Sequence, residues 1–214
     1  MKSAGLRLLV ADGHVIFTDA LRVYLDKIHS VVGTVYDGRT LVEEAIRLRP
    51  DAIITEVAMP GLNGLEAARR IRKQTPLVKF IFLSMHDDLN LAAAALDSGG
   101  TGFVPKQSPG AELLEAIAHA ALGKTYVTPK LRSMGWVERK ERAAQFSKEM
   151  TARQKEVVQL LAEGRSVKQA AGVLNLSEKT IEFHKHRIMQ SHNLRSNADL
   201  VLFAVKRGMI PIPD

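Results

Sequence analysis

The stretch Asp51–Pro60, with the sequence DAIITEVAMP, decides the fold of the first half of this 214-residue chain. Its apolar centre, Ile53-Ile54, predicts a buried strand, and Met59-Pro60 predicts the loop that leaves the strand's carboxyl end. In an open α/β sheet, ligands and chemistry are usually found at that end. The carboxylate placed there belongs to Glu56, which is therefore the first candidate functional residue.

Short apolar runs and amphipathic stretches alternate through residues 1–122. The apolar runs predict strands over 6–11, 31–35, 52–56, 78–84 and 102–105. The amphipathic stretches predict helices over 15–27, 40–48, 65–73, 89–97 and 110–122. Strands that alternate with helices of this length favour a parallel sheet covered on both faces. We therefore expect a doubly wound, flavodoxin-like α/β domain with five strands.

Composition and charge indicate a soluble protein whose second half is basic. Hydrophobic residues make up 46% of the chain and charged residues 25%, which is typical of globular proteins. No apolar run approaches the ~20 residues that span a bilayer, and the absence of cysteine is compatible with the cytoplasm. Residues 1–122 carry 13 Lys and Arg against 14 Asp and Glu, whereas residues 123–214 carry 17 against 9. The second half is thus the one expected to meet a polyanion.

The alternating pattern ends near Gly123, and residues 123–147 predict an interdomain linker. Thr128-Pro129 interrupts any regular element, and the polar stretch that follows has a weak helical period with room for one short helix. Trp136 is expected to anchor this segment on a domain surface.

Residues 148–214 predict an all-α domain that contains a helix-turn-helix. A helix over 167–174 is followed by a three-residue turn and a longer helix over 178–191. Another amphipathic helix is expected over 198–206. Thr151 with Gln154 and Ser166 with Gln169 fit the capping-box spacing, Gly164 is placed to end a helix, and Ser177 is placed to cap one.

The helix over 178–191 has two faces with different expected roles. Ile181, His184 and Ile188 recur at helical spacing and mark its inward face. The opposite face and its flanks carry groups that can read base edges or hold phosphates: Glu182, Phe183, Lys185, His186 and Arg187. For any single charge, an ordinary solvated helix surface is the alternative.

The segment MTARQKEVVQLLAEGRSVKQAAGVLNLSEKTIEFHKHRIM resembles the LuxR-type helix-turn-helix of the NarL/FixJ response regulators. The residues that carry the resemblance are Thr151, Glu156, Gly164, Lys168, Ala171, Leu176-Ser177, Thr180-Ile181 and His184. It implies base reading by Glu182, Phe183, Lys185 and His186. It implies phosphate contacts by Lys168, Lys179, Thr180 and Arg187. It also implies that the last helix pairs two copies on a two-fold DNA site, through Asp199, Leu202 and Val205. His192-Asn193 departs from the family pattern and leaves the turn there uncertain.

Residues 5–122 resemble a response-regulator receiver domain. Working receivers place two adjacent acids after the first strand, a phosphoacceptor Asp after the third, Ser or Thr after the fourth and Lys after the fifth. The matching positions here are Asp12-Gly13, Glu56, Ser84 and Lys106, with Phe103 at the switch aromatic. The second acid and the acceptor Asp are therefore replaced.

Both replacements predict weak or absent Mg²⁺ binding and phosphorylation. Phosphoryl transfer to a carboxylate needs Mg²⁺ in octahedral geometry, and Gly13 has no side chain to offer it. The extra methylene of Glu56 moves the nucleophile by roughly 1.5 Å, and a misplacement of ~1 Å can cost about a hundredfold in rate. Glu56 could instead reach Lys106 and Ser84 and hold an active-like state, or it could be a remnant without a role.

The sequence thus favours a phosphorylation-independent, homodimeric transcription regulator that binds promoter DNA and needs no cofactor. The alternatives are a conventional phosphorylated regulator and a protein–protein adaptor with a silent helix-turn-helix. An enzyme is not expected, because no nucleophile–base pair or glycine-rich phosphate loop is present. RNA polymerase is a compatible partner, a membrane is not expected, and the altered pocket argues against a cognate histidine kinase.

Overall fold

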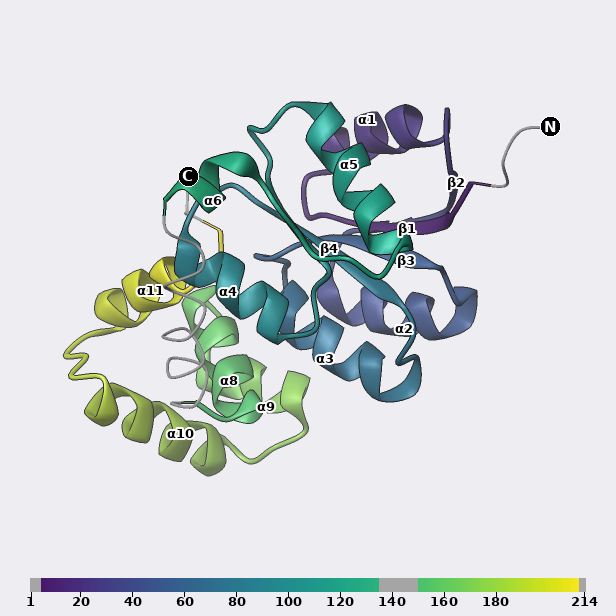
Figure 1. Ribbon diagram of the computed structural model, residues 1–214. Coiled ribbons are helices and arrows are strands. Elements are labelled where there is room, and N and C mark those ends of the chain that lie inside the picture. Colours follow the sequence, from purple (N-terminus) through teal and green to yellow (C-terminus); the bar gives the residue numbers. More distant parts are fainter. Residues whose placement is uncertain (1–4, 135–149, 212–214) are drawn as a thin grey trace.

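The computed structural model describes residues 5–134 and 150–211, which form an α/β domain and a smaller helical domain packed against it (Figure 1). Most of the segment expected to link them lies outside these residues, and so does Trp136. No helix within the described ranges is long and apolar enough to cross a membrane.

Six parallel strands form one sheet in the order β2-β1-β3-β4-β5-β6. Their bounds are β1 Arg7–Ala11, β2 Ser30–Val35, β3 Ala52–Glu56, β4 Lys79–Ser84, β5 Gly102–Pro105 and β6 Tyr126–Val127. The expectation of five strands is therefore wrong by one. The sixth, β6, pairs in parallel with β5 and both of its side chains are buried. At two residues it is too short to carry a periodic signal, which is why the sequence pattern did not predict it.

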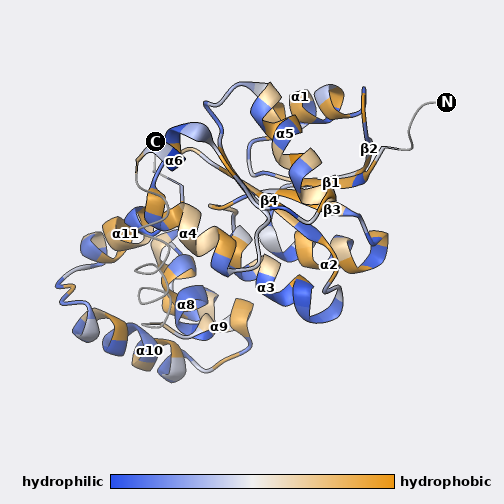
Figure 2. Ribbon diagram, in the orientation of Figure 1, coloured by the Kyte–Doolittle hydropathy of each residue, from blue (hydrophilic) through white to orange (hydrophobic). Residues whose placement is uncertain are grey.

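Helices cover both faces of the sheet, as Figure 1 shows. On one face lie α1 (Val15–Leu25) and α5 (Gly110–Ala121). On the other lie α2 (Gly38–Leu48), α3 (Gly64–Gln74) and α4 (Leu89–Asp97). Alternate strand residues enter the two apolar cores, so that β3 is buried along its whole length. The hydropathy colouring of Figure 2 shows the same arrangement, with the central strands mostly hydrophobic.

The segment after α5 packs back onto the sheet domain, beyond its expected end at residue 122. A short helix, α6 (Pro129–Ser133), follows β6. Leu131 of α6 is fully buried in the core on the α2–α4 side, where Val127 also lies. Residues 126–133 therefore belong to the packed α/β domain.

The helical domain consists of α8 (Ala152–Ala162), α9 (Val167–Leu174), α10 (Glu178–Ser191) and α11 (Asn197–Lys206). Thr151 and Ser166 both form the expected capping boxes, and Ser177 accepts a hydrogen bond from the Thr180 N–H. Gly164 ends the first of these helices with a φ of +82°.

The inward face of α10 agrees with its sequence pattern. Ile181 and Ile188 are buried, each in one of two small apolar clusters that hold the four helices together. His184 is only half-buried between them, so it contributes less to the core than expected.

Candidate functional sites

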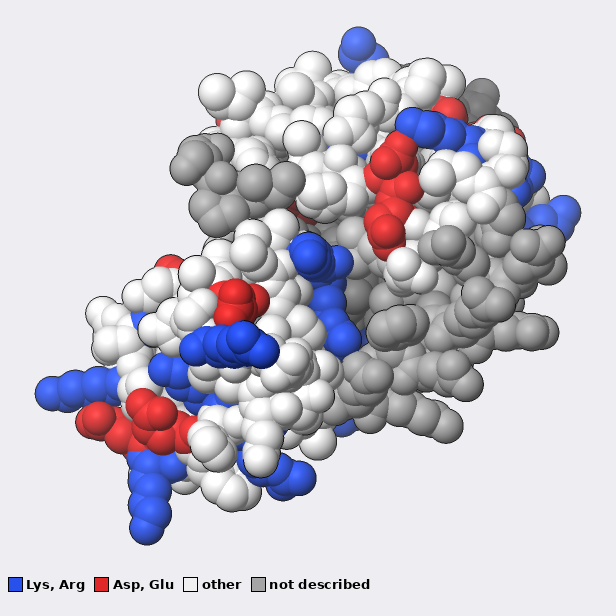
Figure 3. All heavy atoms as spheres, turned by 90° about the vertical axis from the view of Figure 1, so that its left-hand side faces the viewer, with Lys and Arg blue, Asp and Glu red and all other residues white. Residues whose placement is uncertain are grey.

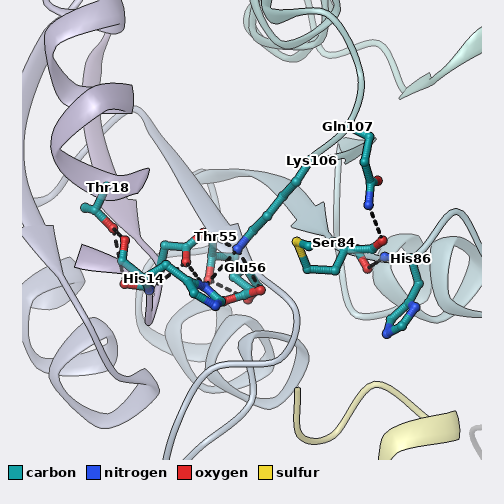
Figure 4. Close-up of polar contacts among 10 residues, drawn as sticks. His14, Thr18, Thr55, Glu56, Ser84, His86, Lys106 and Gln107 are labelled. Atoms are coloured by element: carbon teal, nitrogen blue, oxygen red, sulfur yellow. Dashed lines mark hydrogen bonds and ion pairs between the residues drawn. The ribbon is translucent and has the colours of Figure 1, made fainter. Parts of the chain in front are cut away.

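The candidate receiver residues meet at one edge of the sheet, because the strands are parallel and each side chain stands at or just after a carboxyl end. Asp12 follows β1, Glu56 ends β3, Ser84 ends β4 and Lys106 follows β5. Figure 4 shows Lys106 reaching across this edge toward Glu56 and His14.

The Lys106 ammonium joins both acids of this sheet-edge pocket. Its Nζ lies 2.7 Å from Asp12 Oδ2 and 2.7 Å from Glu56 Oε1. The three side chains are almost inaccessible to solvent, at 5% exposure for Lys106, 0% for Asp12 and 2% for Glu56. A buried charge is tolerated when it is paired and hydrogen-bonded, and this lysine supplies the pairing.

His14 adds a fourth polar group, on the solvent side of the other three. Its Nδ1 lies 3.0 Å from Asp12 Oδ1, 3.6 Å from Glu56 Oε2 and 3.3 Å from Lys106 Nζ. Asp12, His14 and Glu56 together offer ligand atoms within 4.8 Å of one another, a grouping that could hold a metal ion. The Lys106 ammonium, however, already provides a cation between the two carboxylates.

The Glu56 carboxylate is in an unfavourable position for a charge. Burial raises the pKa of Glu56 above its ordinary value, and the charge of Asp12 raises it further, while Lys106 opposes both. Its second oxygen, Oε2, is buried without a hydrogen-bond partner among the described residues. The long side chain thus reaches Lys106, as expected from the sequence, but leaves half of its carboxylate unsatisfied.

Two neighbours of the pocket take no part in the ion pairs. Ser84 lies beside Glu56 in the cavity described below but does not hydrogen-bond it, contrary to expectation. The Ser84 Oγ instead accepts a hydrogen bond from the His86 N–H at 3.0 Å. Gly13 lies against Pro60, where an added Cβ would come within 3.2 Å of the ring Cδ. The position of the second acid is therefore both empty of ligand atoms and tightly flanked.

The mouth of the pocket is partly covered by the helical domain. A cavity of about 240 Å³ beside Glu56 is lined by receiver residues and also by Gly208 and Pro211, which follow α11. Gly208 has a φ of +61°, and a Cβ there would come within 2.7 Å of Leu91 on α4. A glycine at this position allows the chain after α11 to approach the receiver closely.

The loop after Glu56 is held by α8 of the helical domain. The Gln159 side chain donates from Nε2 to the Met59 carbonyl at 2.8 Å and accepts at Oε1 from the Asn63 N–H at 2.8 Å. Glu163 Oε1 accepts from the Gly61 N–H at 2.9 Å. The loop that follows Glu56 is thus hydrogen-bonded directly to the helical domain.

Charged residues extend this contact along α3. Glu156, which is 5% exposed, pairs with Arg70 and lies 3.8 Å from Arg39. In the sequence, Glu156 stands out only through the family resemblance, and Gln159 was not predicted as a functional residue. The available signal was the polar residue inside the apolar run VVQLL, since a buried glutamine requires hydrogen-bond partners.

The candidate switch aromatic, Phe103, is fully buried in the core on the α2–α4 side of the sheet. Its ring therefore points into the receiver.

The candidate nucleic-acid interface lies on the outer side of the helical domain. In Figure 1, α10 is on the far side of α8 and α9 from the sheet, and in Figure 2 it is largely hydrophilic. Thr180, which bonds Ser177 within the cap at 2.8 Å, and Lys185 are half-buried. The other predicted DNA-contacting residues are exposed: Lys168, Lys179, Glu182, Phe183, His186 and Arg187.

The exposed groups on α10 are arranged as a continuous polar and aromatic surface. Phe183 is 56% exposed and carries the Arg187 guanidinium 5.7 Å from its ring centre. Figure 3 shows Lys and Arg side chains outnumbering acidic ones over the lower-left lobe, which is the helical domain. Basic groups exposed to solvent attract polyanions, and no buried ion pair has to be broken for them to do so.

The residues predicted to pair two copies have different surroundings on α11. Leu202 is 58% exposed, whereas Val205 packs partly against the domain's own core. Asp199 Oδ2 accepts from the N–H groups of Arg195 and Ser196, and these hydrogen bonds lower the pKa of Asp199. The Asp199 carboxylate is thus engaged in capping its own helix, and Leu202 is the member of this set that is free to contact a second copy.

The departure at His192-Asn193 has a structural explanation. Asn193 adopts a positive φ of 54°, a conformation that Asn tolerates better than most residues. The His192 ring packs 4.6 Å from that of Phe203 on α11. The turn between α10 and α11 is therefore formed with Asn193, not glycine, at the positive φ.

Each half of the chain matches a known protein family. Residues 8–118 match the response regulator receiver domain, and residues 148–204 match the luxR family of bacterial regulatory proteins. The chain is 30% identical to the oxygen regulatory protein NreC of Staphylococcus epidermidis, over 96% of this chain and 99% of that protein.

Solved structures of RcsB are similar over nearly the whole chain. One from Salmonella enterica serovar Typhimurium, bound to promoter rprA with phosphomimetic BeF3−, has a TM-score of 0.66 at 26% identity and covers 93% of this chain and 98% of that one. A structure of two RcsB dimers bound to two parallel DNAs has a TM-score of 0.58 at 26% identity, covering 95% and 98%.

Proposed function

Because this chain belongs to the response regulators that join a receiver domain to a LuxR-family domain, we propose that it binds promoter DNA and regulates transcription without Mg²⁺-dependent phosphorylation of its receiver. The single observation that carries the second part is the Lys106 ammonium bridging Asp12 and Glu56 at 2.7 Å each.

The residues of the pocket do not fit a Mg²⁺ ion. Mg²⁺ needs oxygen ligands at ~2.0–2.1 Å in octahedral geometry. Gly13 supplies none, and one oxygen of each remaining carboxylate, Asp12 Oδ2 and Glu56 Oε1, is already engaged by the Lys106 ammonium. We therefore assign no step of this protein's function to Mg²⁺, and a cognate histidine kinase is not part of the proposal.

The pocket instead carries its own fixed ion pairs, which hold the receiver in one state. The loop after Glu56 is bound by Gln159 and Glu163, and the cavity beside Glu56 is bounded by Gly208. The state of this edge is in this way linked to the docking of the helical domain. A signal that changes the docking can act on the regulator without a phosphoryl group.

DNA binding is assigned to α10 and its flanks. Lys179 and Arg187 would hold phosphates, and Glu182, Lys185 and His186 would face base edges, on the side of the domain turned away from the receiver. The RcsB–promoter structure supports this assignment by similarity over 93% of the chain. The docked receiver leaves this surface accessible.

A second copy of the chain is the proposed protein partner, and RNA polymerase would follow on promoter DNA. Exposed apolar side chains support self-association: Leu202 on α11 is 58% exposed, and Ile16 and Val23 on α1 are 86% and 66% exposed. The two copies would match a two-fold operator.

The proposal is tested with the full chain incubated with acetyl phosphate and Mg²⁺ and then weighed by intact-protein mass spectrometry. We expect an unchanged mass. A gain of one phosphoryl group would overturn phosphorylation independence. The DNA arm is a mobility-shift titration with promoter fragments at several salt concentrations, where we expect affinity to fall steeply as salt rises. Binding to no fragment would support an adaptor instead.

A further inference from the structure

A second cavity lies between the two domains, away from Glu56. It has a volume of about 340 Å³, which falls within the roughly 300–1,000 Å³ of ordinary small-molecule sites. The receiver contributes residues of α3 and α4, and the helical domain contributes residues of α8, α11 and the turn after α11. Neither domain forms this cavity alone.

Part of the cavity wall is apolar. Leu65 and Leu91 come from the receiver, and Phe203 and Met209 come from the helical domain. Leu65, Leu91 and Met209 are otherwise buried, so the cavity is continuous with the interdomain packing. Such walls accept the hydrocarbon or aromatic body of a small molecule.

The rest of the wall is strongly cationic. Arg69 of α3 faces Lys155 of α8, with Lys206 and Arg207 at the end of α11. The acid at the cavity wall, Asp88, accepts from the Leu91 N–H at 2.8 Å and caps α4.

Among these cations, Lys155 is the one on which the inference rests. Its ammonium forms no hydrogen bond or ion pair with any residue in the described ranges, and the nearby Glu66 pairs with Arg69 at 3.2 Å. Burial lowers the pKa of Lys155, and the charges of Arg69 and Arg207 lower it too, while Glu66 opposes them.

The adjacent residue on α8 provides a contrast within the same interface. Glu156 is buried between Arg70 and Arg39, so the acid on that side meets cations from the receiver. On the Lys155 side, Arg69 of the receiver and Lys155 of the helical domain both line the cavity, so a cation there faces another cation. An anion in the hollow would complete the pairing that the protein itself completes at Glu156.

We propose that this interdomain cavity binds a small organic anion, with its apolar body against Leu65, Leu91 and Phe203 and its acidic group at Lys155. Because both domains line the cavity, the bound anion stabilises the docked arrangement, by an amount that grows with the logarithm of its concentration above the Kd. The site stands on its own geometry and does not depend on the proposed DNA-binding function.

The test uses the full chain and the fluorescent anion 1-anilinonaphthalene-8-sulfonate, which joins an aromatic body to a sulfonate. We expect saturable binding with an affinity at least about tenfold weaker in Lys155→Met. The matched control, Lys124→Met, removes one positive charge from an exposed position outside the cavity and should bind the probe like the unaltered chain. The uncharged probe N-phenyl-1-naphthylamine should not distinguish Lys155→Met from the unaltered chain.

A blocking variant locates the bound probe. Ala94 lines the cavity from α4 and is half-buried, so Ala94→Phe should fill the hollow and abolish binding of both probes. Thermal unfolding of each variant verifies that it is folded, and Lys155→Met should be at least as stable as the unaltered chain because a repulsion is removed. Equal sulfonate affinity in Lys155→Met, retained binding in a folded Ala94→Phe, or no binding at all would each overturn the proposal.

Discussion

The sheet-edge pocket and helix α10 contain the same kinds of side chain and use them in opposite ways. In the pocket, the Lys106 ammonium is 5% exposed and shared by Asp12 and Glu56. On α10, Lys179 and Arg187 face solvent and form no ion pair within the described part of the chain. Charges that are neutralised internally are unavailable to a ligand, whereas charges left in water attract one. The pocket charges are therefore satisfied within the protein, whereas the basic groups of α10 are available to a polyanion.

The energetic logic of the two regions differs accordingly. Both members of a buried ion pair have lost their hydration. Removing one of them therefore leaves the other charge buried and uncompensated. A solvated basic face loses little when one member is removed, and its attraction to DNA depends on salt. Substitutions in the sheet-edge pocket should therefore allow phosphorylation. Substitutions on α10 should reduce the affinity for DNA by graded amounts.

The largest expected effect is a gain of phosphorylation in the double variant Gly13→Asp, Glu56→Asp. Shortening residue 56 moves the carboxylate back by about one bond, a shift that can be worth a hundredfold or so in rate. Restoring the second acid supplies the missing Mg²⁺ ligand. Incubation with acetyl phosphate and Mg²⁺, followed by intact mass measurement, should show a phosphoryl group on the double variant.

One matched control separates charge from shape in this experiment. Gly13→Asn with Glu56→Asp has the same shape without the second carboxylate and should remain unmodified. The Pro60 ring must move by a few tenths of an ångström for either side chain at residue 13, so both variants need a thermal unfolding check. A folded double variant that gains no mass would indicate that the two replacements are not what prevents the reaction, and would leave the Lys106 ion pairs and the chain after α11 at the pocket mouth as the obstacles.

The second effect is on DNA recognition by α10. Lys185→Ala should weaken binding to the preferred sequence by about 1–3 kcal/mol, or roughly 5- to 150-fold, if Lys185 faces a base edge. Binding to unrelated sequences should change less, which distinguishes base reading from phosphate contact. Competition mobility shifts provide the measurement, with Lys124→Ala on the receiver as the control. An equal loss on every sequence would reassign Lys185 to the phosphates.

A smaller effect is expected at the flank of the same helix. Lys179→Ala should weaken binding to all sequences alike and reduce the slope of log affinity against log salt by about one. Titrations at four or five salt concentrations measure that slope. An unchanged slope would place Lys179 away from the DNA backbone.

The elements that position these two regions could be predicted from the sequence because their signals are local. The strand that delivers Glu56 and the helix over 178–191 have strong apolar periods and clear boundaries, and the structure gives them the predicted bounds. Ser177 caps α10 as expected since capping involves only neighbouring residues. The parallel sheet then brings Asp12 and Lys106 to Glu56 by topology alone.

The features that could not be predicted depend on contacts between distant segments. The two-residue strand β6 pairs with β5 at the edge of the sheet, and although Tyr and Val favour strands, two residues are too few to form a periodic signal. The docking of α8 on the loop after Glu56 joins Gln159 to Met59 and Asn63, about a hundred residues earlier. Periodicity and composition contain no information about such pairings, and a single sequence offers only the hint of a polar residue in an apolar run.

The smallest expected effect concerns how the sheet-edge pocket changes the free energy of unfolding with pH. Burial and Asp12 raise the folded-state pKa of Glu56 above the ordinary 4.5, so the native state binds the proton more tightly than the unfolded chain does. Below pH 4.5 both states are protonated at this residue and the difference costs nothing. As pH rises through the window between 4.5 and the raised value, the free energy of unfolding should fall, by about 1.4 kcal/mol for each pH unit that separates the two pKa values.

Glu56→Gln removes this titration while keeping the shape of the side chain. The variant should therefore lose less stability than the unaltered chain between pH 4.5 and pH 8, in urea denaturation followed at closely spaced pH values. Glu43→Gln, an exposed position on α2, controls for the loss of a surface charge. The opposite outcome, a variant whose stability falls more steeply with pH, would mean that Lys106 dominates the carboxylate. In that case the pocket would favour the charged form of Glu56, and the proposed resistance to phosphorylation would rest on geometry alone.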